Sequence, residues 1–267
     1  MPTPPTSFGS ANRSSPASVG LHSPLRWLML GWADLRRNPV PGLVHGLLLT
    51  AFGAFLLWAA RDKFWLLAGA FSGFLIVAPI LATGLYRVSR ACSTGRCVGM
   101  REVVSLWGSG DRRLIGFGLL LGLAGTGWVL TSAGLITLWS PIPIAKPMDF
   151  LRHVVLVREV GLFEVWMLLG IVLAAPVFAS SVVALPMLVD TSASVRTAVT
   201  TSWRAVADHP IPMALWAVTI AVLMGLGMAT ALLGLVVLIP LIAHASWHAY
   251  CDLTERPPSS EASPAMV

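Results

Sequence analysis

The chain has 267 residues, of which 56% are hydrophobic and only 11% are charged, and its mean hydropathy is +0.78. This composition excludes an ordinary soluble globular domain and indicates a membrane protein. The formal net charge of +6 requires no nucleic-acid partner, because basic residues beside membrane spans bind the anionic lipid surface.

The two ends of the chain differ in composition from the rest. Residues 1–25 are rich in Pro, Ser and Thr and contain no long apolar run, so we expect a disordered tail on the cytoplasmic side. Residues 253–267 have a similar composition and predict a second disordered tail. The part between them, residues 26–252, is predicted to be a single membrane domain.

Within this domain the sequence contains six apolar runs that are long enough to cross a bilayer. They cover residues 42–60, 64–86, 114–139, 162–189, 213–232 and 233–251. The last two runs are almost continuous. Residues 213–250 as one helix would be about 57 Å long, well above the roughly 30 Å of a hydrocarbon core, so a helical hairpin is predicted there.

The segments before the first, third and fifth spans resemble one another. Residues 32–41 (WADLRRNPVP) and 203–212 (WRAVADHPIP) share a tryptophan, an acidic residue and a Pro-x-Pro entry to the span, and residues 103–113 are a looser copy. Residues 195–206 have helical amphipathic spacing, which is typical of a helix that lies on the membrane surface. In the loop between the third and fourth spans, residues 150–157 predict a short amphipathic helix on the opposite surface.

A proline near one end of the second, fourth and sixth spans extends the repeat. Pro79, Pro186 and Pro240 each predict a kink, because proline leaves a helix carbonyl without its N–H partner. The predicted fold is therefore an all-α membrane protein of six transmembrane helices, built as three tandem units of one interfacial helix followed by a helical hairpin.

The arginines and lysines predict the orientation of the six spans. Thirteen of the 18 fall beside the N-terminal segment, the second and fourth loops and the C-terminal segment, and five fall on the other side. Both termini are therefore predicted to be cytoplasmic. Cys92, Cys97 and Cys251 fall on that side, where thiols stay reduced, so no disulfide is expected.

Four segments together resemble a known family. They are residues 27–34 (WLMLGWAD) with Pro39, 79–90 (PILATGLYRVSR), 185–190 (LPMLVD) and 240–250 (PLIAHASWHAY). The chain resembles the bacterial integral membrane proteins catalogued as domain of unknown function 2189, and the resemblance spans about residues 27–250. It implies a six-span protein of the bacterial inner membrane. Ala243, Ser246 and Cys251 depart from the family pattern but leave both C-terminal histidines in place.

Those histidines, His244 and His248, are the first candidate binding residues. Four residues apart, they lie on one face of a helix and could ligate haem or a transition metal. The interpretation that we favour is that His244 forms a hydrogen bond between helices, while Trp247, His248 and Tyr250 form an aromatic belt at the cytoplasmic boundary of the membrane. On this interpretation the protein needs no cofactor, and haem or a transition metal is the alternative.

A second group of candidates follows the second and fourth spans. Arg87 and Arg90 are expected to anchor the cytoplasmic side of the protein, as the positive-inside rule predicts. They could instead bind lipid phosphate or pair with Asp190, which follows the fourth span at the same membrane level.

Enzyme chemistry has little support in the sequence, which lacks a phosphate-binding loop, a zinc-protease motif, a nucleophile elbow and paired carboxylates. The leading hypothesis is a non-enzymatic scaffold, assembly or accessory protein, with membrane lipids and another membrane complex as partners. One alternative is a haem- or metal-binding factor in respiratory-oxidase biogenesis that uses the histidine pair. The other is a transporter of small solutes or lipids.

Overall fold

A computed structural model of the protein describes residues 19–59, 61–62, 82–140, 142–156 and 161–255, which form helices and no strands. An all-helical fold is thus confirmed for this part of the chain. The helices are α1 (Ser23–Arg37), α2 (Pro39–Ala59), α4 (Met100–Gly108), α5 (Arg112–Trp139), α6 (Pro147–Phe150), the π-helix η1 (Leu151–Val155), α7 (Leu162–Ser181), α8 (Ala184–Asp190), α9 (Val195–Asp208), α10 (Pro210–Ala229) and α11 (Leu235–Leu253). Residues 82–93 are also helical.

Five stretches within the described residues are long and apolar enough to cross a membrane. They are Pro39–Ala59, Arg112–Trp139, Leu162–Asp190, Pro210–Ala229 and Leu235–Leu253. These match the first, third, fourth, fifth and sixth predicted spans. The second predicted span, 64–86, lies outside the described residues except for residues 82–86, which are helical.

The predicted turn between the last two spans is present at residues 230–234. Ala231 and Leu232 there have φ values of 53° and 71°, a left-handed conformation that ends α10 and reverses the chain. The hairpin is therefore confirmed, with each helix ending a few residues from the predicted boundary.

Short helices precede α2, α5 and α10, as the repeat predicts. Asn38 and His209 adopt nearly the same non-helical conformation (φ −138°, ψ 74° and φ −130°, ψ 55°), each directly before a proline that begins the next helix. A residue before proline is driven out of the α region, so the chain turns a corner at both places. Before α5, where the prolines are missing, Asp111 instead caps the helix by accepting from the Arg113 N–H.

Proline also explains why the fourth predicted span is two helices. α7 ends at Ser181 and α8 begins at Ala184, close to the position where Pro186 cannot donate to the Val182 carbonyl. The N–H of Val183 at the break donates to Ser202 Oγ of α9, at 3.1 Å. The kink predicted at Pro186 is thus a break stabilised by a surface helix. α11 continues through Pro240, and Pro79 lies outside the described residues.

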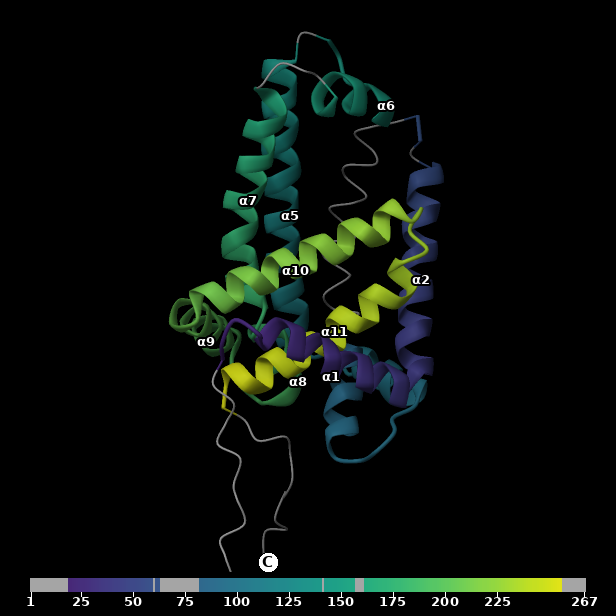
Figure 1. Ribbon diagram of the computed structural model, residues 1–267, viewed down its shortest axis with the longest axis vertical. Coiled ribbons are helices and arrows are strands. Elements are labelled where there is room, and N and C mark those ends of the chain that lie inside the picture. The colour runs from purple at the N-terminus through teal and green to yellow at the C-terminus, as the bar shows by residue number, and fades with distance from the viewer. Residues whose placement is uncertain (1–18, 60, 63–81, 141, 157–160, 256–267) are drawn as a thin grey trace, which may run out of the picture.

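In Figure 1, α5 and α7 form a long hairpin along one side, and α2 runs along the opposite side. α10 and α11 cross obliquely between them, and α1 packs against α11, which also packs against α2. α1, α4, α8 and α9 gather at one end. α6 and η1 cover the other end of the hairpin, where Val154 packs against Ile136. The short helix predicted at residues 150–157 is therefore present in its described part, and it begins earlier than predicted, at Pro147.

The first and last helices extend slightly into the segments that were predicted to be disordered tails. α1 begins at Ser23, inside the predicted tail 1–25, and Ser23 and Pro24 are buried. α11 ends at Leu253, one residue into the predicted tail 253–267, of which residues 256–267 lie outside the described part.

Candidate functional site

The buried end of α11 is the centre of the candidate site. From Ala243 to Tyr250 nearly every residue is buried, because α1, α2, α8 and α10 surround this helix. His244 is completely buried. An intramembrane polar side chain in such a position needs partners from neighbouring helices.

The two histidines of α11 have different partners. His244 Nδ1 lies 2.6 Å from Ser89 Oγ, in the helical segment 82–93. His248 Nε2 lies 2.9 Å from Asp34 Oδ2 on α1. The hydrogen bond between helices that was predicted for His244 is present. Each histidine thus joins α11 to a different element.

One nitrogen of each imidazole remains outside these bonds. His244 Nε2 is buried without a hydrogen-bond partner, and it faces Gly42 of α2. Among the described residues, no group of three or more His, Cys, Asp or Glu side chains is placed to hold a metal ion. A metal ion bound by His244 and His248 would therefore need further ligands that the described His, Cys, Asp and Glu side chains do not provide.

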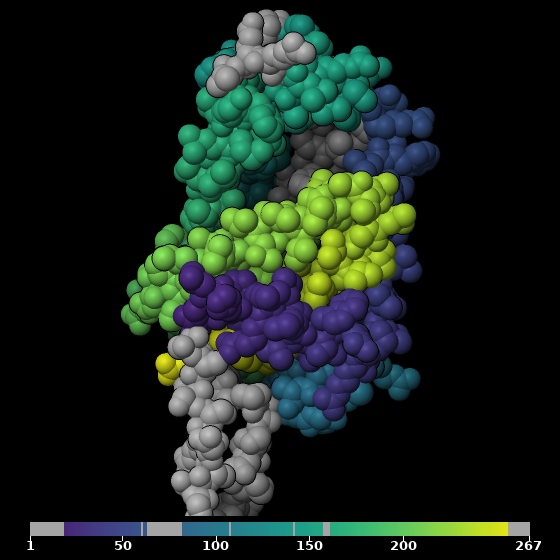
Figure 2. Space-filling view, in the orientation of Figure 1, coloured from purple at the N-terminus to yellow at the C-terminus, as the bar shows by residue number. Residues whose placement is uncertain are grey.

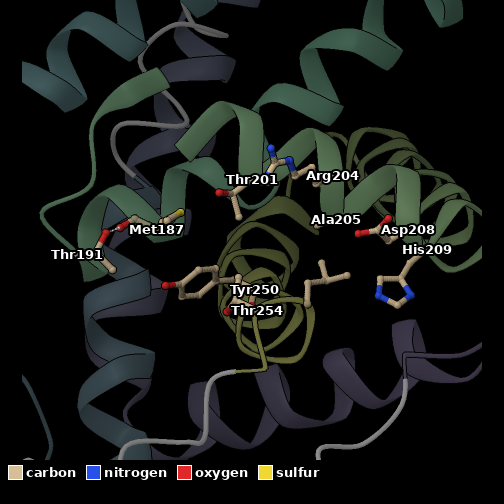
Figure 3. A pocket seen from close by; sticks show the side chains of 10 residues that line it. Met187, Thr191, Thr201, Arg204, Ala205, Asp208, His209, Tyr250 and Thr254 are labelled. Atoms are coloured by element: carbon tan, nitrogen blue, oxygen red, sulfur yellow. Dashed lines mark hydrogen bonds between the residues drawn. The ribbon is translucent and has the colours of Figure 1, made fainter. Parts of the chain in front are cut away.

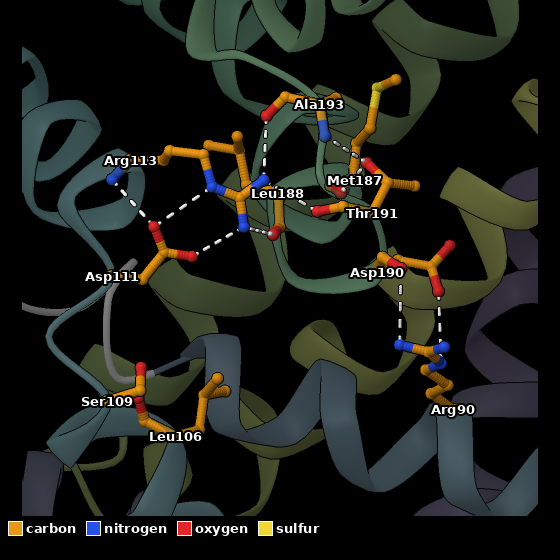
Figure 4. A network of polar contacts seen from close by, with 10 residues as sticks. All are labelled: Arg90, Leu106, Ser109, Asp111, Arg113, Met187, Leu188, Asp190, Thr191 and Ala193. Atoms are coloured by element: carbon orange, nitrogen blue, oxygen red, sulfur yellow. Dashed lines mark hydrogen bonds and ion pairs between the residues drawn. The ribbon is translucent and has the colours of Figure 1, made fainter.

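Arg90, Asp190 and Tyr250 come together at one point. Arg90 Nε lies 3.2 Å from Asp190 Oδ1, and the Tyr250 hydroxyl donates to Asp190 Oδ2 at 2.8 Å. The Asp190 side chain is only 4% exposed, so the arginine and the phenol compensate a largely desolvated carboxylate. Figure 4 shows the Arg90 side chain reaching the end of α8. Arg90 thus makes the pairing predicted as an alternative to lipid contact, whereas Arg87 is exposed.

Trp247 and Tyr250 differ from their predicted position at the lipid boundary. They are 4% and 2% exposed, and their rings pack against each other with centroids 5.4 Å apart. Aromatic residues at the end of a span favour the membrane interface, but here neighbouring helices enclose that end of α11. The contacts these two residues make are with the protein core.

A further polar centre, at Arg113, was not singled out from the sequence. Its guanidinium bonds both carboxylate oxygens of Asp111 and donates to three backbone carbonyls at the end of α8 (Figure 4). The carbonyls belong to Thr191 at 2.8 Å, Ala193 at 2.9 Å and Leu188 at 3.4 Å. The last carbonyls of a helix have no partner within the helix, and the five donors of arginine can bond several of them. Only the spacing Asp-x-Arg at a helix start could have indicated this role.

Asp252 of α11 bonds the N-terminal part of α1, whereas His248 bonds Asp34 near its C-terminal end. Arg26 and Trp27 both donate to Asp252 Oδ2, the indole at 2.5 Å. Trp27 is fully buried and meets the edge of Trp216 of α10 with ring centroids 5.6 Å apart. Together with the Asp34–His248 bond, these contacts fix α1 along α11.

Comparison with known proteins confirms the family resemblance for the middle of the chain, but the match does not include segments 27–34 and 240–250. Residues 66–190 match the family model described as predicted integral membrane protein, domain of unknown function 2189 (DUF2189). The match includes Arg90, Arg113 and Asp190 but ends before α9, α10 and α11. No curated protein and no solved structure matches the chain.

Proposed function

Since the chain is an integral membrane protein that matches DUF2189, we propose that it is a non-enzymatic scaffold or accessory protein for another complex of the bacterial inner membrane. The observation that carries this proposal is the surface of α1. One face of this helix is fixed to the bundle, and the other presents large apolar side chains.

The fixed face contains Trp27, Gly31 and Leu35, all buried. A Cβ added at Gly31 would lie 2.6 Å from the backbone nitrogen of Ala245, so the two helix backbones are in close approach. With Asp252 and His248 bonding opposite ends of α1, this helix has little freedom to move on its own.

The outward face contains Leu25, Met29 and Trp32, which are 44–60% exposed, and Leu21 just before the helix is 61% exposed. Arg36 and Arg37 follow at the end of the helix. Figure 2 shows α1 across the front of the molecule, below α10. Exposed apolar side chains held on a rigid helix at the end of a membrane bundle are suited to binding a neighbouring membrane protein.

Photo-crosslinking tests this function. A benzophenone amino acid placed at Met29 of the full chain, in native membranes, is expected to give a discrete adduct with one membrane protein, identified by mass spectrometry. The same amino acid at Leu138 of α5, which is 90% exposed, is the control for random encounters in the bilayer. Adducts with lipid alone, or the same set of proteins at both positions, would contradict the scaffold function.

The proposed orientation, with both termini cytoplasmic, can be tested through Cys97. This thiol is exposed, whereas Cys92 is buried and burial raises its pKa to about 11, so it remains an unreactive thiol near neutral pH. In a Cys251→Ser background, a membrane-impermeant maleimide should label Cys97 in inverted vesicles and leave it unlabelled in intact spheroplasts. Ala145→Cys, in the exposed loop before α6, should show the opposite pattern. Labelling of Cys97 from outside the spheroplast would reverse the proposed topology.

A haem or metal site at His244 and His248 is the second candidate. A metal-bound imidazole commonly donates its other nitrogen to a carboxylate or another polar group. Ser89 and Asp34 offer such partners and leave His244 Nε2 and one nitrogen of His248 for a ligand. This second candidate predicts that purified protein carries stoichiometric haem or metal and that His244→Ala removes it, as measured by absorption spectra and elemental analysis. Protein free of both after expression in rich and metal-supplemented media would exclude this candidate.

Transport of a polar solute has no comparable observation in its favour within the described part of the chain. A cavity of about 310 Å³ lies among α2, α7, α8, α10 and α11, and within the described part of the chain mainly apolar side chains line it. A transport path for a polar solute normally includes ionisable or polar groups near the midplane.

A further inference from the structure

A cavity of about 570 Å³ that carries polar side chains lies between α8, α9 and α11. In Figure 3, Thr201, Arg204 and Asp208 follow one another along α9 at the edge of the cavity, Thr254 lies on α11, and the Tyr250 ring points from α11 toward the end of α8. His209, at the corner before α10, closes one end. A cavity of this size lies within the range of small-molecule sites.

The polar groups at this cavity differ from those of the neighbouring Asp190 cluster. Asp190, Arg90 and Tyr250 bond one another, whereas the side chains of Thr201, Arg204, Asp208 and His209 make no hydrogen bond or ion pair within the described part of the chain. Arg204 and Asp208 are one turn apart on α9 and could pair, yet they do not. Their bonding capacity is therefore open to a ligand.

The charges on α9 define the chemistry of that ligand. Arg204 offers several N–H donors for a phosphate, and the Thr201 hydroxyl, three residues earlier on the same face, can add one more. Asp208 offers a carboxylate for a cation about 6 Å along the helix from Arg204, as the rise per residue sets. A molecule in which a short linker joins a phosphate to an ammonium group could bind both Arg204 and Asp208.

The place of the cavity in the bundle favours a lipid as the source of this headgroup. It lies where three candidate membrane spans end or begin, at Asp190, Pro210 and Leu253, which is the level of the membrane surface. Starting two residues after His209, α10 presents an exposed apolar row that runs into the membrane. The row consists of Ile211, Leu215, Val218, Val222 and Leu226. Acyl chains could lie along this row while the headgroup occupies the cavity.

We propose that the cavity between α8, α9 and α11 binds the headgroup of an aminophospholipid, with Arg204 and Thr201 on the phosphate and Asp208 on the ammonium group. This site is independent of the outward face of α1. A lipid bound here would join α9, α8 and α11 at the membrane surface.

Native mass spectrometry of the full chain with added lipids tests the proposal. Wild type should bind phosphatidylethanolamine roughly tenfold more tightly than phosphatidylcholine, whose methylated nitrogen cannot donate to Asp208, or phosphatidylglycerol, which lacks the amine. Asp208→Asn should remove this preference. Arg204→Gln should weaken the binding of both phosphatidylethanolamine and phosphatidylglycerol by roughly tenfold. Arg204→Lys should retain part of the affinity that Arg204→Gln loses.

Two matched controls are available on surface helices. Arg196 is exposed on α9 and Glu102 is exposed on α4, and neither lines the cavity, so Arg196→Gln and Glu102→Gln should bind lipid as wild type does. Equal affinity of wild type for the three lipids, or equal losses in the controls, would overturn the proposal. Free phosphoethanolamine is a further competitor. If it displaced the lipid at equal concentration, the site would still recognise a phosphate with an ammonium group, but the proposal that its ligand is a membrane lipid would be overturned.

Discussion

Replacing Gly46 with alanine should destabilise the protein by about 1–3 kcal/mol and lower its apparent Tm by several degrees. α2 and α11 meet at this glycine. A Cβ there would lie 2.0 Å from the Val236 carbonyl oxygen and 2.7 Å from its carbonyl carbon. Since both are backbone atoms of a neighbouring helix, the clash can be relieved only by moving one helix away from the other. Thermal unfolding of the detergent-solubilised full chain, followed by tryptophan fluorescence, measures the effect.

Gly127→Ala is the matched control for this substitution. Gly127 also lies inside a predicted span, in α5, but a Cβ added there meets nothing within 4 Å. Alanine has the higher helix propensity, so this variant should be as stable as wild type or slightly more so. If both variants unfold at the same temperature as wild type, the α2–α11 contact is looser than the structure describes.

The helices and their corners could be predicted from the sequence because their causes are local. Runs of apolar residues and the Pro-x-Pro segments at Pro39 and Pro210 act within a few residues, and the structure has helix ends at both. The break before Pro186 was predictable in kind, as a kink. Its capping by Ser202 of α9 was not, because that contact depends on how a surface helix packs.

The partners of the candidate residues could not be predicted in the same way. His248 and Asp34 are 214 positions apart, and His244 and Ser89 are 155 apart, so no spacing rule connects them. The burial of Trp247 has the same origin. An aromatic side chain at the end of a span fits the lipid boundary and the protein core equally well, and only the packing of α1 and α8 around α11 distinguishes the two.

The pairing of Arg90, Asp190 and Tyr250 gives the repeated architecture a structural role. These residues follow Pro79, Pro186 and Pro240 near the ends of the second, fourth and sixth predicted spans. In the structure the three ends meet, and opposite charge and a phenol join them. The ends of these three predicted spans therefore meet through polar contacts at one end of the bundle.

Replacing Arg113 with alanine should cost about 2 kcal/mol of stability, because it removes the side chain that joins the start of α5 to the end of α8. The Asp111 carboxylate would lose its partner, and the carbonyls of Leu188, Thr191 and Ala193 would lose their donor. Both charged side chains are about one-quarter to one-third exposed, so water compensates part of the loss. Arg113→Lys should be intermediate, since one ammonium group cannot replace the forked donors.

Arg112→Ala separates this contact from a general effect of positive charge. Arg112 is the neighbouring residue and is exposed, so its loss changes the charge of the same helix start without touching α8. We expect Arg112→Ala to unfold as wild type does. Equal destabilisation by both variants would mean that charge at the membrane surface, and not the α5–α8 contact, sets the stability.

The pH dependence gives a second readout of the same contact. The hydrogen bond from Arg113 holds the pKa of Asp111 below its ordinary value of 3.8. A carboxyl group whose pKa is lowered on folding stabilises the native state above its unfolded pKa, and this contribution is lost as the pH falls through the folded pKa. Arg113→Ala should therefore be less stable than wild type at neutral pH, and the difference should shrink as the pH falls below about 4. A difference that stayed constant with pH would assign the stability to the bonds between Arg113 and the α8 carbonyls alone.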